Sequence, residues 1–103
     1  MIPRLEKDIQ RQILYYLRSI GAYCGKVKTM GVRRGKVFCR DPFLMRGMVD
    51  VIAFYNGQLY FIEVKSPNGV QSNEQKQFEW ECKKAGIPYI LAFSVDHVIA
   101  VIN

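Results

Sequence analysis

The chain has 103 residues, half of them apolar, and its 15 Lys and Arg residues outweigh nine Asp and Glu residues to give a net charge of +6. This length suits one domain around a single modest core, and the apolar content excludes an intrinsically disordered chain. No apolar run approaches the roughly 18 to 20 residues that span a bilayer. The first residues, MIPRLEKDIQ, also lack the apolar stretch of a signal peptide. We therefore expect one soluble domain, residues 1–103, in the cytoplasm.

Metal binding through sulfur or imidazole is disfavoured. The three cysteines, Cys24, Cys39 and Cys82, are odd in number and have no CxxC spacing, and His97 is the only histidine. We expect reduced thiols and no zinc site. The scarcity of histidine also limits general-base chemistry at neutral pH.

The first third of the chain predicts a helix followed by strands. Apolar residues recur at helical spacing up to Ile20, and Gly21 suits a helix end, which predicts a helix over residues 3–19. Two weaker strands are predicted at 22–29 and 35–40, joined through the glycine-flanked basic turn MGVRRG.

The strongest local signal is the pair Asn56-Gly57, which stands between VDVIAFY and QLYFIEVKS. Both flanking segments are rich in β-branched and aromatic residues, and Asn-Gly is the preferred sequence of a two-residue hairpin turn. The sequence therefore predicts an antiparallel hairpin here.

A second helix follows the hairpin. Ser72 and Gln75 fit a capping box, and Gly86 suits the residue after the last turn, which predicts a helix over residues 73–85. Its inward stripe would consist of Gln75, Phe78, Cys82 and Ala85.

The last two apolar segments, 88–93 and 98–102, predict short strands, the first of them covered on both faces. The predicted order of the core is helix, three strands, helix and strand, and 98–102 allows one strand more. We expect an α/β fold with a central mixed sheet flanked by two helices.

The hairpin brings two carboxylates together. With Asn56-Gly57 as the turn, Asp50 lies directly opposite Glu63, with β-carbons about 4.5 to 5.5 Å apart, and Lys65 shares their face. Apolar residues on the same face make this trio one end of an otherwise buried surface: Ile52, Phe54, Leu59 and Phe61. The alternative is a solvated strand face with Asp50 at a strand end.

Like charges that face each other on a sheet are destabilising unless a cation lies between them. Two carboxylates with a backbone carbonyl and waters form the sparse oxygen ligation that Mg²⁺ prefers. Such an ion can polarise a phosphodiester and lower the pKa of a bound water. Lys65 would supply a point charge near the phosphate or hold the attacking water.

The excess positive charge is concentrated between residues 26 and 46, where seven basic residues stand against Asp41 alone. This window predicts a surface that binds a polyanion, the alternative being a solvated hairpin with ordinary surface charges. The predicted DNA-binding residues are Lys26, Lys28, Arg33, Arg34, Lys36, Arg40 and Arg46. Few aromatic residues stand among them, so phosphate contacts fit better than base stacking.

The segment GMVDVIAFYNGQLYFIEVKSPNGVQSNEQKQFEWECKKAGIPYILAF resembles the core of the PD-(D/E)xK nuclease superfamily, and within it the virus-type replication-repair nuclease (VRR-NUC) domain. The family's motifs fall on Glu6 in the first helix, on Gly47 to Asp50, on Glu63 to Lys65, and on Ser72 with Gln75. The resemblance spans essentially the whole chain in the order αβββαβ. Val49 stands where the family usually has proline, and its β-branched side chain favours the same extended backbone.

The resemblance implies a site for Mg²⁺, with Mn²⁺ as a substitute, held by Asp50, Glu63 and the backbone carbonyl of Val64. Glu6 would complete the metal site directly or through water, and Lys65 would assist the attacking water. Gln75 would have a second role in the pocket. From the residues alone, the helix dipole explains Glu6 and the capping box explains Gln75.

The function implied is a metal-dependent, structure-specific DNA endonuclease that cuts branched or duplex DNA. Free-standing members of the family resemble archaeal-type Holliday junction resolvases, so the expected activity is junction resolution as a homodimer, in a bacterial or phage-infected host cell. A homodimer would also explain Trp80, which falls on the side of its helix opposite Phe78 and Cys82. The alternatives are a flap-directed or general DNA nuclease, a catalytically silent nucleic-acid-binding module, and a small domain that binds an acidic protein.

Overall fold

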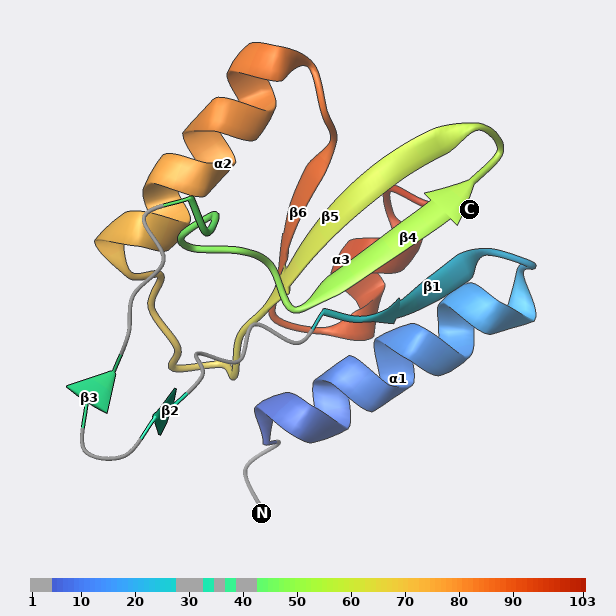
Figure 1. Cartoon of the computed structure of the whole chain (residues 1–103). Helices are drawn as coiled ribbons and strands as arrows, with labels where there is room; N and C mark the ends of the chain where they lie inside the picture. Colours follow the sequence, from blue (N-terminus) through green and yellow to red (C-terminus); the bar gives the residue numbers. More distant parts are fainter. Residues whose placement is uncertain (1–4, 28–32, 35–36, 39–42) are drawn as a thin grey trace.

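The computed structural model describes residues 5–27, 33–34, 37–38 and 43–103, and for 33–34 and 37–38 it describes the backbone alone. The described elements are, in chain order, α1 (Glu6–Ser19), β1 (Tyr23–Lys26), β2 (Arg33–Arg34), β3 (Val37–Phe38), β4 (Val51–Tyr55), β5 (Gln58–Val64), α2 (Asn73–Ala85), β6 (Tyr89–Ala92) and α3 (Val95–Ile99) (Figure 1). None of the helices in these ranges is long and apolar enough to cross a membrane.

The central sheet has the strand order β1-β4-β5-β6. Strands β1, β4 and β5 are antiparallel neighbours, whereas β6 runs parallel to β5 after the crossover through α2. The predicted α/β class with a mixed sheet is therefore confirmed. Along the chain, α1 precedes β1, β4 and β5, and α2 and β6 follow them, which is the predicted order. Strands β2 and β3 form a separate two-stranded sheet.

The β4–β5 hairpin forms as predicted. Asn56 and Gly57 both have positive φ, 50° and 73°, which is the backbone of a type I′ turn and explains why this pair is required. The register runs from Tyr55 opposite Gln58 to Val51 opposite Ile62.

One face of the sheet carries the main core. Ile9, Ile13 and Leu17 recur at helical spacing on α1 and are fully buried against side chains of β4, β5 and β6, among them Val51 and Ile62. Helix α3 covers the same face. Each of these buried aliphatic side chains contributes about 1.5 to 3 kcal/mol to folding, so α1 is held mainly by this stripe.

Helix α2 covers the other face through a smaller cluster. Phe78 meets the edge of the Phe61 ring at 5.3 Å and packs with Cys82 and Val49. This face also carries Asp50, Glu63 and Lys65, and the expectation that it is otherwise buried is wrong. Phe54 on the same face is 51% exposed, because α2 covers only part of the sheet.

The segment 98–102, expected as a strand, is instead the end of α3 and the turn that follows it. Val98 and Ile102, four residues apart, are buried, whereas Ile99 and Val101 are exposed. This is helical rather than alternating burial. The molecule therefore has three helices in its described part, where two were expected.

The expected basic turn at 30–35 is also wrong in part. Arg33–Arg34 form strand β2 and pair with Val37–Phe38, so these arginines lie in a strand and not in a turn. The predicted strand at 22–29 is confirmed over Tyr23–Lys26, but its partner is β4 rather than the segment that follows it. Residues 3–4 of the helix predicted over 3–19 lie outside the described residues, and α1 begins at Glu6.

Helix α2 begins and ends where the sequence predicts. Ser72 is the N-cap of a complete capping box, and Gly86 closes the helix with a φ of 75°. Of the predicted inward stripe, Phe78 and Cys82 are buried, but Ala85 is exposed.

Candidate functional site

Asp50 and Glu63 meet where β4 begins and β5 ends. Asp50 directly precedes β4, and continuing the observed register by one residue places it opposite Glu63. Its Oδ2 accepts a hydrogen bond from the Val64 N–H at 2.9 Å, and its backbone carbonyl accepts one from the Val27 N–H at 2.8 Å. Asp50 is therefore fixed by the strands on both sides.

Among the charged residues whose side chains the structure describes, Glu63 is the most buried, with 1% exposure. Its Oε2 accepts a hydrogen bond from Gln75 Nε2 at 2.9 Å and lies 3.5 Å from Lys65 Nζ. Its Oε1 is buried and finds no hydrogen-bond partner among the described residues. A buried acceptor without a partner is costly, and in native proteins it is explained by strain, by a catalytic role, or by a water or ion at that position.

The environment of Glu63 favours its neutral form. Burial, followed by the negative charge of Asp50, raises the pKa of Glu63 to about 8, and the nearby Lys65 ammonium only partly opposes this. One lysine is thus insufficient to neutralise the carboxylate pair. A divalent cation beside both carboxylates would supply the missing positive charge.

Glu6 extends the negative charge of the site from a different element. It stands in the first turn of α1, and its side chain remains accessible to solvent. Its pKa is raised by partial burial and then by the charge of Asp50, while Lys65 lowers it. The fold therefore places Glu6 within electrostatic range of both residues, and its predicted part in the metal site stays a prediction.

Gln75 joins α2 to the site through both ends of its amide. Its Oε1 accepts from the Ser72 N–H at 2.9 Å, its backbone N–H donates to Ser72 Oγ at 3.1 Å, and its Nε2 donates to Glu63. From the sequence, the capping box explains Gln75 and the resemblance implies a second role in the pocket, but neither predicts the contact with Glu63. The structure shows that the cap and this contact coexist, because the cap fixes Oε1 and leaves Nε2 directed at the carboxylate.

Gly47 has a positioning role that its place in the motif does not reveal. Its φ is 70°, and an added β-carbon would collide with the Glu74 carbonyl and lie 2.7 Å from the Gln75 backbone nitrogen. The segment leading to Asp50 thus passes directly against the first turn of α2. Val49, in the same segment, is buried against Phe78 and Cys82.

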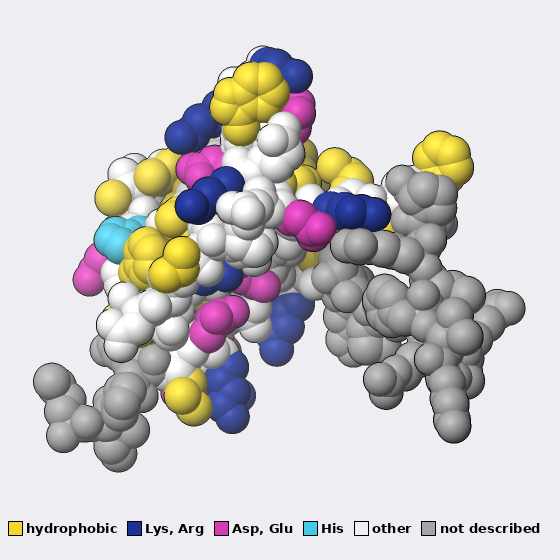
Figure 2. Space-filling model, turned by 90° about the vertical axis from the view of Figure 1, so that its left-hand side faces the viewer, with side chains coloured by type: hydrophobic (Ala, Val, Ile, Leu, Met, Phe, Trp, Pro, Cys, Tyr) yellow, Lys and Arg dark blue, Asp and Glu magenta, His cyan; other side chains and the backbone are white. Residues whose placement is uncertain are grey.

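The basic window is described only in part. Lys28, Lys36 and Arg40 lie outside the described residues, and Arg33 and Arg34 are described by their backbone in β2. Arg46 lies 3.8 Å from Glu74. Figure 2 shows acidic and basic side chains interspersed over the described part of the visible face. The described residues of this face therefore do not form a surface of positive charge alone.

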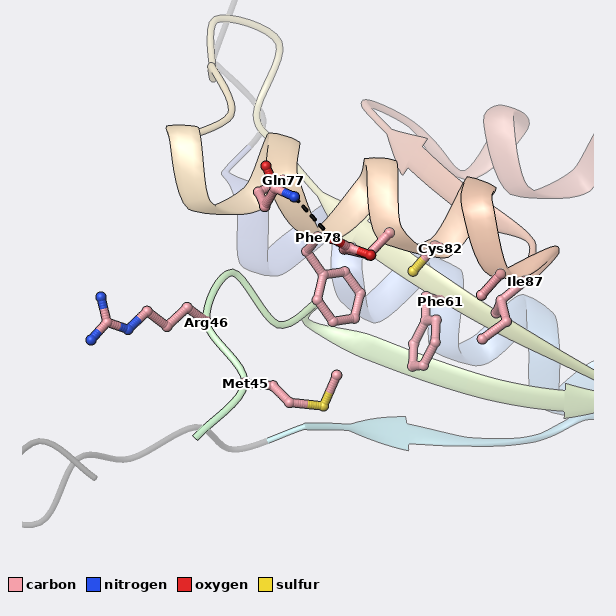
Figure 3. A pocket seen from close by; sticks show the side chains of 9 residues that line it. Met45, Arg46, Phe61, Gln77, Phe78, Cys82 and Ile87 are labelled. Atoms are coloured by element: carbon pink, nitrogen blue, oxygen red, sulfur yellow. Dashed lines mark hydrogen bonds between the residues drawn. The ribbon is translucent and has the colours of Figure 1, made fainter. Parts of the chain in front are cut away.

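An apolar cavity of about 490 Å³ lies away from the carboxylates, between α2, β5 and residues 45–46. Met45, Phe61, Phe78, Cys82 and Ile87 surround one space, and the Arg46 side chain is directed away from it (Figure 3). Neither Asp50, Glu63 nor Lys65 lines this cavity, so we do not assign it to the site.

The donor set fits a hard cation. The described residues contain no group of three or more His, Cys, Asp or Glu side chains placed to hold a metal ion. The predicted ligands are instead two carboxylates with the Val64 carbonyl, all oxygen atoms, as Mg²⁺ and Mn²⁺ prefer. The buried Glu63 Oε1 without a partner is the atom that such an ion would satisfy. These are therefore the residues that would hold a divalent ion, with water in its remaining coordination positions.

The residues without a predicted role have contacts within the fold. His97 Nδ1 accepts a hydrogen bond from the Phe93 N–H at 3.0 Å. The Tyr23 and Phe54 rings are stacked across β1 and β4. Cys24 and Cys82 are free thiols, and Cys39 lies outside the described residues.

No protein-family model matches this chain, and no curated protein sequence is significantly similar to it.

Proposed function

We propose that this protein is a metal-dependent DNA endonuclease of the PD-(D/E)xK type, similar to the VRR-NUC domain, that hydrolyses phosphodiester bonds in branched DNA. The observation that carries the proposal is the cluster at the β4–β5 strand ends. Asp50 and Glu63 adjoin there, Lys65 and Gln75 both contact Glu63, and Glu63 Oε1 is left without a partner.

Each residue has a role that follows from its contacts. Asp50, Glu63 and the Val64 carbonyl would hold Mg²⁺, with Glu6 adding negative charge. When bound, the ion would polarise the phosphodiester and lower the pKa of a water. Gln75 fixes the orientation of the Glu63 carboxylate through its hydrogen bond. Lys65 lies beside Glu63 and can offer a positive charge to the phosphate or position the attacking water.

Phosphate contacts from the basic window would supply most of the affinity for DNA, with little sequence readout. In Figure 1 the β2–β3 hairpin, which contains Arg33 and Arg34, lies at the end of the molecule where α1 begins. That is also the end of α1 that carries Glu6. A backbone bound along this hairpin would pass close to the carboxylates. Cutting a four-way junction symmetrically would require two copies of the chain.

The test is Asp50→Asn, assayed with Mg²⁺ or Mn²⁺ on a synthetic four-way junction, a flap and a duplex. This substitution removes one charge at the proposed metal site, so we expect cleavage to be lost and DNA affinity to be kept or increased. Asp96→Asn in α3, on the opposite side of the sheet from α2, is the matched control and should cut like wild type.

Two outcomes would reject the proposal. Unchanged cleavage by Asp50→Asn removes Asp50 from the reaction. Wild-type protein that binds DNA but cuts none of the three substrates would instead indicate a catalytically silent nucleic-acid-binding module. In that case calorimetric titration of Mg²⁺ in the presence of DNA should show no ion bound at Asp50 and Glu63.

A further inference from the structure

The sheet face that carries the candidate site continues into an uncovered aromatic surface. Helix α2 packs through Phe78 against Phe61 of β5 and Tyr89 of β6, at ring distances of 5.3 and 6.3 Å. It leaves the β1–β4 part of the same face open, where Tyr23 is 78% exposed and Phe54 about half exposed. Because these two large apolar side chains are adjacent, they form an exposed patch rather than isolated surface residues, and such patches mark binding surfaces.

These two aromatic residues form one platform. Tyr23 and Phe54 are direct cross-strand partners, and their rings stack with centroids 6.1 Å apart and an interplanar angle of 21°. Gly25 follows Tyr23 on the same face, and a β-carbon built on it would meet nothing within 4 Å. A shallow groove of about 270 Å³ results, lined by Tyr23, Cys24, Gly25, Lys26, Val27, Ile52 and Phe54.

The groove leads to the carboxylates. Asp50 and Phe54 are four residues apart on one face, a separation of about 13 Å along an extended strand. Val27, at the groove's end, donates its N–H to the carbonyl of Asp50 at 2.8 Å. Lys26, at the exposed edge of β1, adds a positive charge to this end. The groove therefore ends next to Asp50.

We propose that this groove binds an unpaired, single-stranded segment of DNA, with a base stacked on Tyr23 and Phe54 and the backbone directed along β4 toward Asp50 and Glu63. Stacking on flat apolar rings beside a lysine is how proteins bind single strands without sequence preference. The inference rests on the proposed nuclease function and narrows its substrate to branched DNA with an unpaired arm next to the bond that is cut. Tyr23 and Phe54 lie far apart in the sequence and outside the basic window, so only the sheet pairing reveals them.

The test measures binding of a fluorescent oligothymidylate in chelator, where no cleavage occurs, and compares it with binding of a blunt duplex. We expect Tyr23→Ala and Phe54→Ala each to weaken single-strand binding about 5- to 100-fold and to change duplex binding little. Tyr23→Phe keeps the ring and should bind like wild type. Gly25→Val adds a side chain to the open groove at a position without backbone strain and should also weaken single-strand binding.

The control is Tyr15→Ala, which removes an exposed tyrosine from α1 on the other side of the sheet. Unchanged single-strand binding in Tyr23→Ala and Phe54→Ala would overturn the proposal, and the nuclease proposal would stand if Asp50→Asn still abolished cleavage. Analytical sedimentation of the same variants tests the competing explanation, in which a second copy of the chain covers the platform. A change of oligomeric state without loss of single-strand binding would mean that a second copy covers the platform, which also overturns the inference.

Weaker single-strand binding in these variants, in a protein that cuts no DNA in any form, would support the groove and reject the nuclease. The two proposals therefore fail by different observations. If both proposals are correct, wild-type protein should quench the fluorescence of a base analogue placed in the unpaired arm of a flap. Tyr23→Ala should not quench it.

Discussion

Glu63 is nearly inaccessible to solvent, and each of its oxygens has a different environment. Oε2 is held by Gln75 and Lys65, whereas Oε1 has no partner among the described residues. Burial and Asp50 together raise the pKa of Glu63 to about 8. The ionised form of Glu63 is therefore unfavourable unless a further positive charge binds beside it.

The raised pKa predicts how stability depends on pH in metal-free protein. An unfolded glutamate titrates near 4.5 and folded Glu63 near 8, so between these values the folded state holds more protons. The free energy of unfolding should therefore fall as pH rises from about 5 to about 8. Mg²⁺ should reverse the loss at the higher pH, because the ion stabilises the ionised carboxylate.

Thermal unfolding at both pH values, with chelator and with Mg²⁺, measures this dependence. Glu63→Gln should flatten the pH dependence and remove the response to Mg²⁺, because its amide does not ionise. A Mg²⁺ response in Glu63→Gln equal to that of wild type would place the ion elsewhere.

Gln75 offers a substitution that separates capping from the site. Gln75→Glu keeps an acceptor oxygen for the Ser72 N–H, and Glu is equally suited to this capping-box position. It replaces the Nε2 donor to Glu63 with a second carboxylate oxygen. We expect cleavage to fall about 10- to 100-fold, as for other residues that orient a metal ligand, with helix content unchanged.

Initial cleavage rates and circular dichroism test this prediction together. Gln58→Glu, at the exposed end of the hairpin, makes the same chemical change away from the site and should be neutral. Full activity in Gln75→Glu would show that its hydrogen bond to Glu63 is structural only.

At the scale of elements, the contact between the Gly47 segment and α2 sets the geometry of the site. This segment delivers Asp50, α2 delivers Gln75, and the two backbones touch at Gly47. A side chain at residue 47 would force them apart and would also place a non-glycine residue at a φ of 70°.

Gly47→Ala should lower the free energy of unfolding by about 2 to 5 kcal/mol, the sum of a strained φ and an overpacked contact. Gly21→Ala is the matched control, because Gly21 has a φ of 86° but open space around it. Gly21→Ala should lower the free energy of unfolding only by the cost of the strained φ, about 1 to 2 kcal/mol. Equal losses in the two variants, measured by denaturant unfolding, would mean that the contact with α2 is unimportant.

The helix that ends the chain shows a limit of local patterns. The apolar run VIAVI has the residue types of a strand, and its pattern predicts one. In the structure Val98 and Ile102 face the main core and α3 forms over Val95–Ile99. A short apolar run has no period that distinguishes a strand from a helix. Here Val98 and Ile102 pack in one cluster with the apolar side chains of α1, which a helix allows.

At the scale of the whole molecule, the outward side of α2 remains exposed. Trp80 is 55% exposed, and Lys84 Nζ lies 4.5 Å from its ring centroid. If the proposed homodimer uses this side, Trp80→Ala should shift the protein toward monomer in sedimentation equilibrium, because exposed tryptophans are frequent anchors of interfaces. Arg11→Ala on α1, which covers the other face of the sheet, should have no effect. A wild-type monomer, or an unchanged dimer in Trp80→Ala, would contradict this placement.

The sequence by itself determined the parts of this protein whose interactions are local. The Asn56-Gly57 turn fixed the hairpin register and so the adjacency of Asp50 and Glu63, and Ser72 with Gln75 and Gly86 fixed both ends of α2. These signals act within a few residues, through backbone conformation and capping hydrogen bonds.

Only the tertiary structure decided which partners lie across the sheet and between the layers. Four features depend on elements that are distant in sequence. They are the pairing of β1 with β4, the burial of Glu63, its contact with Gln75, and the close approach of Gly47 to the backbone of α2. The exposed pair of Tyr23 and Phe54 and the helical end of the chain depend on such elements as well. Burial and long-range pairing are properties of the assembled layers, so no local pattern of residues specifies them.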